Sequence, residues 1–185
     1  QLLTLVTENA RRLPNLRYCD IRVQISEEKG AVSENGTEKA SAENQAFDFG
    51  VRVIAGKKAA APGYYGTILG ARDYDRIGSL VWEGVQQAYE RANANARNKS
   101  TIRKRLGPLA NSIYDTCLAP VTVCQDTVSA KYQIDPRSVP LTHVMGMAID
   151  GCKAARAPGQ QVVFTAASAN TLLMRELFCS SEGAD

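Results

Sequence analysis

The sequence predicts an α+β fold: an antiparallel meander covered by amphipathic helices, with a C-terminal helix and two further strands. Three observations predict it. Apolar and polar residues alternate along residues 19–25, as in a strand with one buried face. Asn35-Gly36 is a strong hairpin signal, because both central residues of that tight turn need positive φ. Apolar residues recur every three or four positions along residues 77–96, as on a helix that covers a sheet.

The first half of the chain is expected to form a short helix and then the meander. Apolar residues from Leu3 to Leu13 lie at helical spacing, and Pro14-Asn15 ends that helix. Residues 49–54 are the most apolar strand, and residues 55–57 turn the chain back. The expected strands are residues 17–26, 31–34, 37–47, 49–54 and 58–67.

The helix at residues 77–96 must cover the meander, because a lone meander would leave its apolar face in water. Asp73 and Asp75 are placed to cap it. After it we expect a break at residues 98–107, an extended segment marked by prolines, and a helix at residues 141–157. Two strands, residues 161–165 and 172–179, are expected to finish the chain, joined near residues 168–170.

This order of elements predicts two regions, an α+β domain at 1–105 and a connecting segment at 106–185. The second region ends on a strand and a turn, so we expect it to be truncated at Asp185.

The composition argues against several classes of protein. A net charge of +3 is too small for a dedicated nucleic-acid binder, and no apolar run approaches the roughly 18 residues that cross a bilayer. No secretion signal is visible at the start, so a cytoplasmic location is expected. The five cysteines form no C-x-x-C pair, and we interpret them as structural residues, chiefly small buried hydrophobes.

The residues needed for self-sufficient catalysis are missing. A hydrolytic zinc needs about three protein ligands, but His143 is the single histidine and no H-E-x-x-H is present. There is no G-x-S-x-G elbow, and the spacing of Gly63, Gly66 and Gly70 is wrong for a dinucleotide fingerprint. We therefore predict no catalytic residue, no metal ligand and no cofactor in this chain.

A basic cluster, Arg97–Arg105, places five positive charges in nine residues. Such charges could contact phosphates, which leaves an alternative function open: a stand-alone domain that binds DNA or a nucleoid protein. No aromatic residue is interleaved there to stack on bases. A solvated helix end, where cations suit the helix dipole, is the simpler interpretation.

Several short runs, in order, resemble the TldD/PmbA ("modulator of DNA gyrase") family, and the resemblance covers nearly the whole chain. Members of that family begin with a strand of the form x-D-x-R, a G-V-R-V hairpin and an alanine-rich helix. A connecting segment and a closing x-x-S-x-G run follow. Residues 58–66 are longer than the family's usual return strand, which indicates a divergent branch. The matching runs are YCDIRV (18–23), FGVRVIAGK (49–57), residues 77–96, APV (119–121), DPRSV (135–139), residues 141–157 and FCSSEG (178–183).

The resemblance implies an N-terminal half of a zinc metallopeptidase-related protein that processes peptides as a homo- or hetero-dimer of TldD/PmbA-type subunits. The family's zinc motif, H-E-x-x-x-H, lies in the second half, so none of its ligands can be assigned here and this chain is expected to be inactive alone. If partner or peptide contacts lie in these residues, we expect them at Arg52, Tyr64 and Tyr65, since aromatic residues in exposed loops favour interfaces.

Overall fold

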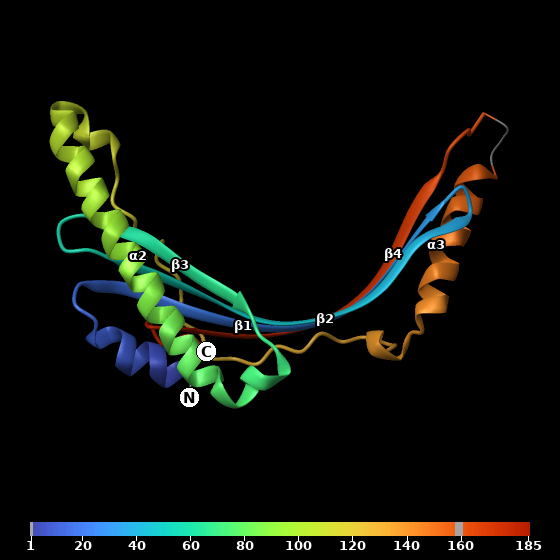
Figure 1. Cartoon of the computed structure of the whole chain (residues 1–185), viewed down its shortest axis with the longest axis horizontal. Coiled ribbons are helices and arrows are strands. Elements are labelled where there is room, and N and C mark those ends of the chain that lie inside the picture. Colours follow the sequence, from blue (N-terminus) through green and yellow to red (C-terminus); the bar gives the residue numbers. More distant parts are fainter. Residues whose placement is uncertain (1, 158–160) are drawn as a thin grey trace. The chain divides into compact units, whose positions relative to one another are not determined.

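The computed structural model describes residues 2–157 and 161–185. It contains one four-stranded sheet with the strand order β3-β2-β1-β4, together with helices, which confirms the predicted α+β class (Figure 1). The strands are β1 (Leu16–Glu34), β2 (Thr37–Ala55), β3 (Ala61–Ile68) and β4 (Ala166–Ser180). The α-helices are α1 (Leu2–Thr4), α2 (Ile77–Leu106) and α3 (Leu141–Arg156). The remaining helical turns are Leu5–Asn9, Ala10–Arg12, Ala71–Arg76, Gly107–Ser112 and Pro136–Ser138.

The strands are antiparallel, and they are held together by a tight turn between β1 and β2 and by backbone hydrogen bonds near both ends of β1 and β4. Asn35 (φ 53°) and Gly36 (φ 78°) form the predicted turn between β1 and β2. Between β1 and β4, the Ser181 N–H donates to the Cys19 carbonyl (2.7 Å) and the Asn35 N–H donates to the Thr165 carbonyl (2.8 Å).

The contacts of the chain group into two compact units. Unit 1 comprises Gln1–Gln24, Phe47–Thr127 and Glu176–Asp185, and unit 2 comprises Ile25–Ala46 and Val128–Arg175. This grouping differs from the boundary expected at residue 105. The difference arises because β1, β2 and β4 each pass through both units, which periodicity within a short window could not show.

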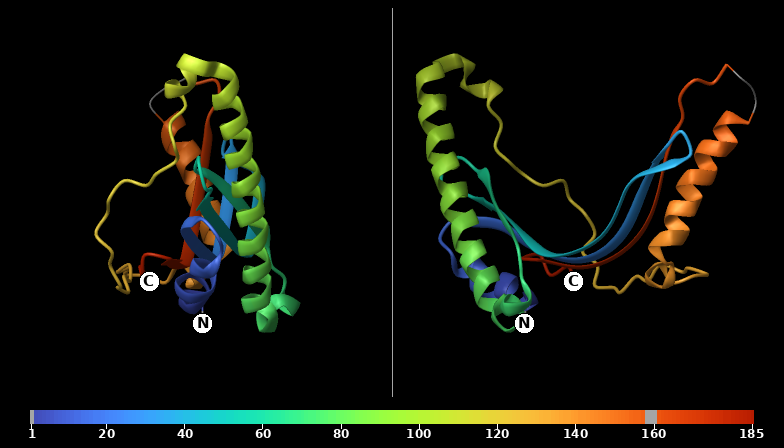
Figure 2. Two further views of the ribbon diagram at one scale, coloured as in Figure 1. Left: turned by 90° about the vertical axis from the view of Figure 1, so that its left-hand side faces the viewer. Right: turned by 45° about the vertical axis from the view of Figure 1, so that its right-hand side comes forward.

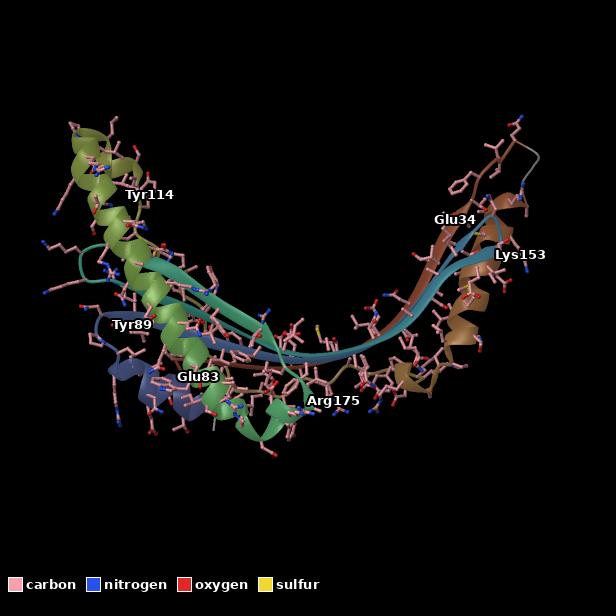
Figure 3. The ribbon with its side chains drawn as sticks, viewed as in Figure 1. Glu34, Glu83, Tyr89, Tyr114, Lys153 and Arg175 are labelled. Atoms are coloured by element: carbon pink, nitrogen blue, oxygen red, sulfur yellow. The ribbon has the colours of Figure 1, made fainter. Side chains whose placement is uncertain are left out.

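In unit 1, α2 lies along the face of β3 and β2 and buries the main core (Figure 2). Each large apolar side chain buried there stabilises the fold by about 1.5–3 kcal/mol. At its edge, the Tyr89 hydroxyl of α2 donates to the Pro14 carbonyl (2.7 Å) and so holds the end of the N-terminal helical segment (Figure 3). The centre of this core is formed by Cys19, Ile21, Phe49, Val51, Val53, Val81, Val85 and Ala88.

In unit 2, α3 covers the sheet with a smaller core. Val144, Met145 and Ala148 of α3 pack against Ala31 of β1. The Cys152 thiol donates to the Ser33 carbonyl (3.2 Å), which brings the last turns of α3 onto the β1–β2 hairpin. The predicted helix at 141–157 is therefore confirmed to within one residue.

Two predicted breaks are wrong. The helix expected to end before residue 98 continues to Leu106, because lysine and arginine are good helix formers and the positive charges lie at its C-terminal end. The turn expected at residues 168–170 is part of the single strand β4, and residues 161–165, expected to form the first of two C-terminal strands, lie before β4 and form no strand. Pairing with β1 outweighs the weak turn preference of Ser168 and Asn170 there. Residues 27–30, expected to lie outside the strands, belong to β1, and the strands expected at 31–34 and 37–47 are confirmed as parts of β1 and β2.

Other local predictions are confirmed in part. The N-terminal helical segment is present but irregular, with a π-turn and a 3₁₀ turn after α1. Asp73 accepts from the backbone N–H of Gly70 (2.8 Å) and caps the 3₁₀ turn before α2 rather than α2 itself. None of the helices in the described part of the chain is both long enough and apolar enough to cross a membrane.

Three of the five cysteines, Cys19, Cys152 and Cys179, are buried, and Cys117 and Cys124 are exposed. Burial raises the pKa of the Cys19 thiol to about 12 and that of Cys179 to about 11. The nearby carboxylates, Asp20 for Cys19 and Asp185 for Cys179, add to this effect. In the folded protein both thiols therefore stay protonated up to a higher pH than they do in the unfolded chain.

The raised thiol pKa values predict that the protein loses stability in alkali. Their stabilising effect is complete below a pH of about 9 and decreases as the pH rises toward 11 to 12, because the unfolded chain releases these protons first. At pH 10 we expect the free energy of unfolding to fall by about 2–3 kcal/mol relative to pH 8, with about half of the decrease from each thiol. Urea unfolding at both pH values measures this. The Cys19→Ala/Cys179→Ala variant should show a clearly smaller decrease; an equal decrease would assign the effect to other groups.

Candidate functional site

The sheet of unit 1 carries a hollow of about 270 Å³ on the face opposite α2. Phe49, Val51 and Val53 of β2 point toward α2, so the alternate residue Arg52 points to the other face. Arg52 lies opposite Tyr64 in the antiparallel register of β2 and β3. The hollow is lined by Asp20, Arg22, Gly50, Val51, Arg52, Tyr64, Tyr65 and Phe178.

The hollow is thus bordered by all three residues predicted as contacts: Arg52, Tyr64 and Tyr65. Their side chains differ in what they contact. Tyr64 is 58% exposed on the same face as Arg52. Tyr65 points to the opposite face: its ring lies 6.0 Å from that of Phe49, and the guanidinium of Arg91 stands over it at 5.6 Å. The Tyr65 side chain is therefore part of the packing between β3 and α2.

Arg52 is held by a buried carboxylate on the neighbouring strand. Its Nε donates to Asp20 Oδ2 (2.8 Å), and its Nη2 donates to the same oxygen. The ring of Tyr18 lies under the guanidinium, 5.4 Å from its carbon. Burial, together with the charge of Asp20 and a hydrogen bond to it, raises the pKa of Tyr18 to about 12. The guanidinium is therefore fixed in position, with its exposed edge facing the hollow.

The other wall combines a second arginine with an aromatic ring. Arg22 of β1 stands over the ring of Phe178 of β4 (5.9 Å), and its Nε lies 3.4 Å from Glu176 Oε1. Sequence reasoning did not select Asp20, Arg22 or Phe178 as site residues. Tyr18, Asp20 and Arg22 alternate along β1, which does indicate one shared face, but the position of Phe178 depends on the pairing of β1 with β4.

The chemistry of this hollow suits binding. Guanidinium groups donate to carboxylates and carbonyls, and exposed aromatic rings contact apolar side chains and the faces of peptide groups. The residues that line it supply no hydroxyl or thiol paired with a base, so it holds no arrangement for nucleophilic catalysis. Among the described residues, no three His, Cys, Asp or Glu side chains gather to hold a metal ion.

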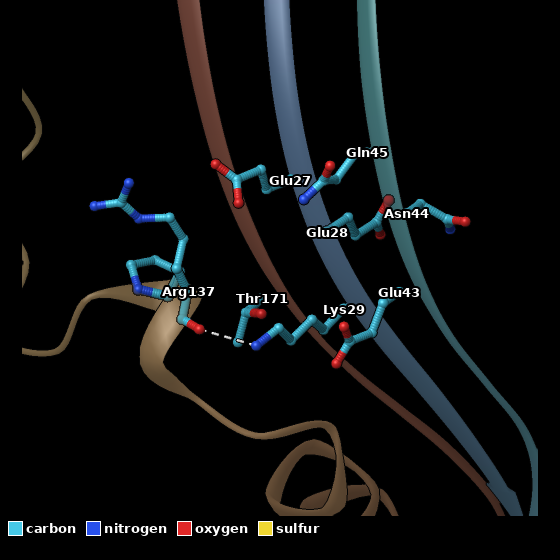
Figure 4. Close-up of a pocket in the computed structure, with 9 residues that line it drawn as sticks. Glu27, Glu28, Lys29, Glu43, Asn44, Gln45, Arg137 and Thr171 are labelled. Carbon is cyan, nitrogen blue, oxygen red and sulfur yellow. Dashed lines mark hydrogen bonds between the residues drawn. The ribbon is translucent and has the colours of Figure 1, made fainter. Parts of the chain in front are cut away.

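A second pocket, of about 200 Å³, lies in unit 2 and serves to anchor a connecting segment (Figure 4). The ammonium group of Lys29 on β1 donates to the carbonyls of Arg137 (2.9 Å) and Val139 (2.7 Å). These two bonds tie the 3₁₀ turn at Pro136–Ser138 to the sheet. The remaining lining is polar and comes mainly from β1 and β2: Glu27, Glu28, Glu43, Asn44, Gln45 and Thr171.

The basic cluster Arg97–Arg105 is partly occupied by contacts within the chain. The Lys99 ammonium donates to the Ala60 carbonyl (2.7 Å), and Arg103 pairs with Asp115 (2.8 Å). The first contact ties α2 to the residue before β3, and the second holds the segment that follows α2 against the helix. The cations left exposed there are Arg97, Lys104 and Arg105. His143 is exposed in the first turn of α3.

No family model and no curated protein matches the sequence. Solved structures do match in fold. The chain is similar to TldE from Thermococcus kodakarensis (TM-score 0.53, 14% identity), with 96% of this chain covering 34% of that one. It is also similar to two proteins described as a "putative modulator" of DNA gyrase. One is from Bacteroides thetaiotaomicron (TM-score 0.57, 9% identity, 98% of this chain and 36% of that one). The other is from Thermotoga maritima (TM-score 0.50, 13% identity, 91% of this chain and 32% of that one).

Proposed function

We propose that this chain is the non-catalytic N-terminal region of a TldD/PmbA-like, peptidase-related protein, and that it supports assembly and the peptide-processing cavity. The observation that carries the proposal is the extent of the shared fold. Between 91% and 98% of the chain takes the fold of the three solved structures, yet it spans only about a third of each of them. In the protein that we propose, nearly all of this chain would build one region of a larger architecture.

The chemistry of the residues supports a non-catalytic role. The described residues bring together no metal cluster, and the hollow of unit 1 holds no nucleophile paired with a base. In this proposal zinc is bound elsewhere, in a region of the parent protein outside these residues or in a TldD/PmbA-type partner subunit. The parent would act on peptides in the cytoplasm as a homo- or hetero-dimer.

The hollow of unit 1 is the surface we propose for peptide contact. Arg52 offers a guanidinium that Asp20 holds in place, and Tyr64 offers an exposed ring directly across the strand pair. A positioned cation beside an aromatic ring can bind a peptide carbonyl or carboxylate together with an apolar side chain. Because Arg52 is fixed before binding, little conformational entropy would be lost there.

Peptide binding and hydrolysis by the purified chain test this proposal. With zinc and a fluorogenic peptide we expect no hydrolysis above background; clear hydrolysis would contradict a non-catalytic role. Fluorescence anisotropy with a labelled unstructured peptide should detect binding. Tyr64→Ser should weaken that binding about threefold or more, because it removes the exposed ring of the hollow.

Tyr114→Ser is the matched control for the peptide-binding experiment. Tyr114 is a still more exposed tyrosine of unit 1 and does not line the hollow (Figure 3). Its replacement should leave the affinity unchanged. Equal losses for both variants would show that the peptide contacts exposed tyrosines without regard to the hollow.

A further inference from the structure

Gly50 of β2 is a glycine that neither the backbone nor the packing requires. It lies inside a strand, where glycine is disfavoured because it loses more conformational entropy on folding than other residues. Its φ is not positive, so any residue could adopt this backbone. A Cβ atom there would meet nothing within 4 Å. A strand glycine of this kind often marks a place where a ligand lies close to the backbone.

This glycine leaves a gap in the layer of side chains that lines the hollow of unit 1. Gly50 lines the hollow, and its partner in the antiparallel register of β2 and β3 is a second glycine, Gly66. Gly66 has a local reason to be glycine, since a Cβ atom there would lie 3.3 Å from the Phe49 carbonyl oxygen. Together the two facing glycines expose peptide groups, which form a flat floor without side chains.

Planar side chains border this floor. Tyr64, whose ring is exposed, is the diagonal neighbour of Gly50 across the strand pair, and Arg52 lies two residues further along β2. On the other wall, the guanidinium of Arg22 stands over the ring of Phe178. Aromatic rings and guanidinium groups both interact favourably with a further aromatic ring, by edge-to-face or offset contacts and by cation–π attraction.

The charges around the hollow are balanced, which favours a neutral occupant. Arg52 pairs with Asp20, and Arg22 pairs with Glu176. A carboxylate would compete with these partners, and an ammonium group would meet two guanidinium groups. A neutral ring gains from each guanidinium without displacing its carboxylate. The hollow of about 270 Å³ is smaller than the roughly 300–1,000 Å³ of pockets for drug-sized ligands, so it suits a single side chain.

We infer that this hollow binds one aromatic side chain of a peptide, whose ring lies on the peptide groups at Gly50, between Tyr64 and the two arginines. The missing side chain at Gly50 is what allows the ring to approach the sheet. The inference rests on the proposed function, and it adds the class of residue that the bound peptide carries.

Fluorescence anisotropy with three labelled peptides tests the inference. The peptides differ at one position, which is phenylalanine, cyclohexylalanine or serine. Cyclohexylalanine is close in size to phenylalanine but has no π-system, so it keeps the apolar contact and loses the ring and cation–π interactions. The 185-residue chain should bind the phenylalanine peptide about fivefold more tightly than the cyclohexylalanine peptide, and the serine peptide most weakly.

The three affinities separate this inference from the proposed function. Equal affinities for the phenylalanine and cyclohexylalanine peptides would overturn the inference, while peptide binding itself would stand. If none of the three peptides binds, the proposed function fails together with the inference.

Gly50→Val tests the position of the ring, because it fills the floor with a side chain that strands favour. It should weaken binding of the phenylalanine peptide about tenfold, to the level of the serine peptide. Gly30→Val is the matched control. Gly30 is a strand glycine of β1 in unit 2, where a Cβ atom also meets nothing within 4 Å, and its replacement should leave the affinity unchanged. Equal affinities for the two folded variants would overturn the inference.

Nuclear magnetic resonance of the unaltered chain gives a second readout that does not depend on the folding of a variant. The ring of the bound phenylalanine peptide should shift the amide resonance of Gly50 through its ring current and leave that of Gly30 in place. The serine peptide should produce a much smaller shift at Gly50. Saturating binding of the phenylalanine peptide without a shift at Gly50 would contradict the inference.

Discussion

Replacing Gly63 with alanine should destabilise the protein by about 3 kcal/mol, at the upper end of the usual cost of overpacking. Gly63 of β3 lies opposite Val53 on the face that contacts α2. A Cβ atom there would lie 2.1 Å from the Ala88 carbonyl oxygen and 2.4 Å from the Ala92 nitrogen. Both are backbone atoms of α2, so no side chain can rotate away. Either β3 or α2 must shift, and the core between them would lose contacts.

Chemical denaturation of Gly63→Ala measures this effect, and Gly50→Ala is the matched control. Gly50 is also a strand glycine of unit 1, but a Cβ atom there would meet nothing within 4 Å. Its replacement should be neutral or stabilising by up to about 1 kcal/mol, because alanine restricts the unfolded chain. Equal stabilities for the two variants would contradict the close approach of β3 to α2.

The second large effect is expected at Arg52. Arg52→Leu removes the partner of Asp20, a carboxylate that is 6% exposed, and leaves its charge uncompensated. Loss of one member of a fully buried ion pair costs about 3–5 kcal/mol. The Arg52 side chain is 38% exposed, so water can replace part of the interaction. We therefore expect the free energy of unfolding to fall by about 2–3 kcal/mol.

Two further variants separate the role of the Arg52 charge from that of its bulk. Arg22→Leu removes a guanidinium from the same hollow, but its pair with Glu176 is more exposed, and the loss should stay under about 1 kcal/mol. Adding Asp20→Asn to Arg52→Leu removes the unpaired charge and should recover part of the stability. If urea unfolding shows no recovery, the Arg52 side chain stabilises the sheet through packing instead.

Local features of this chain could be predicted from the sequence alone. The turn at Asn35-Gly36, the start of α2 at Ile77 and the extent of α3 follow from residues within one or two turns of each other. Backbone preference and the spacing of apolar residues act over such short windows, so a single sequence contains the information. The same reasoning predicted the α+β class and a helix-covered meander.

The candidate site was predicted only in part, for a physical reason. Arg52 and Tyr64 lie close together in sequence, within one strand pair, and their proximity could be anticipated. The carboxylate that fixes Arg52 lies on β1, and Phe178 lies on β4, far along the chain from both. The choice of strand partners depends on the relative free energies of alternative long-range pairings, and periodicity carries no information about them.

The difference between local patterns and long-range pairing also explains the course of the long strands. The sequence by itself determined the turn at Asn35-Gly36, the start of α2 and the extent of α3, as well as the absence of a second histidine or a nucleophile elbow. Only the tertiary structure decided that residues 168–170 continue one strand, β4, and that β4 pairs with β1 at the end of the sheet order. A polar segment can become a strand when its backbone groups find partners in a neighbouring strand, and those partners lie outside any local window.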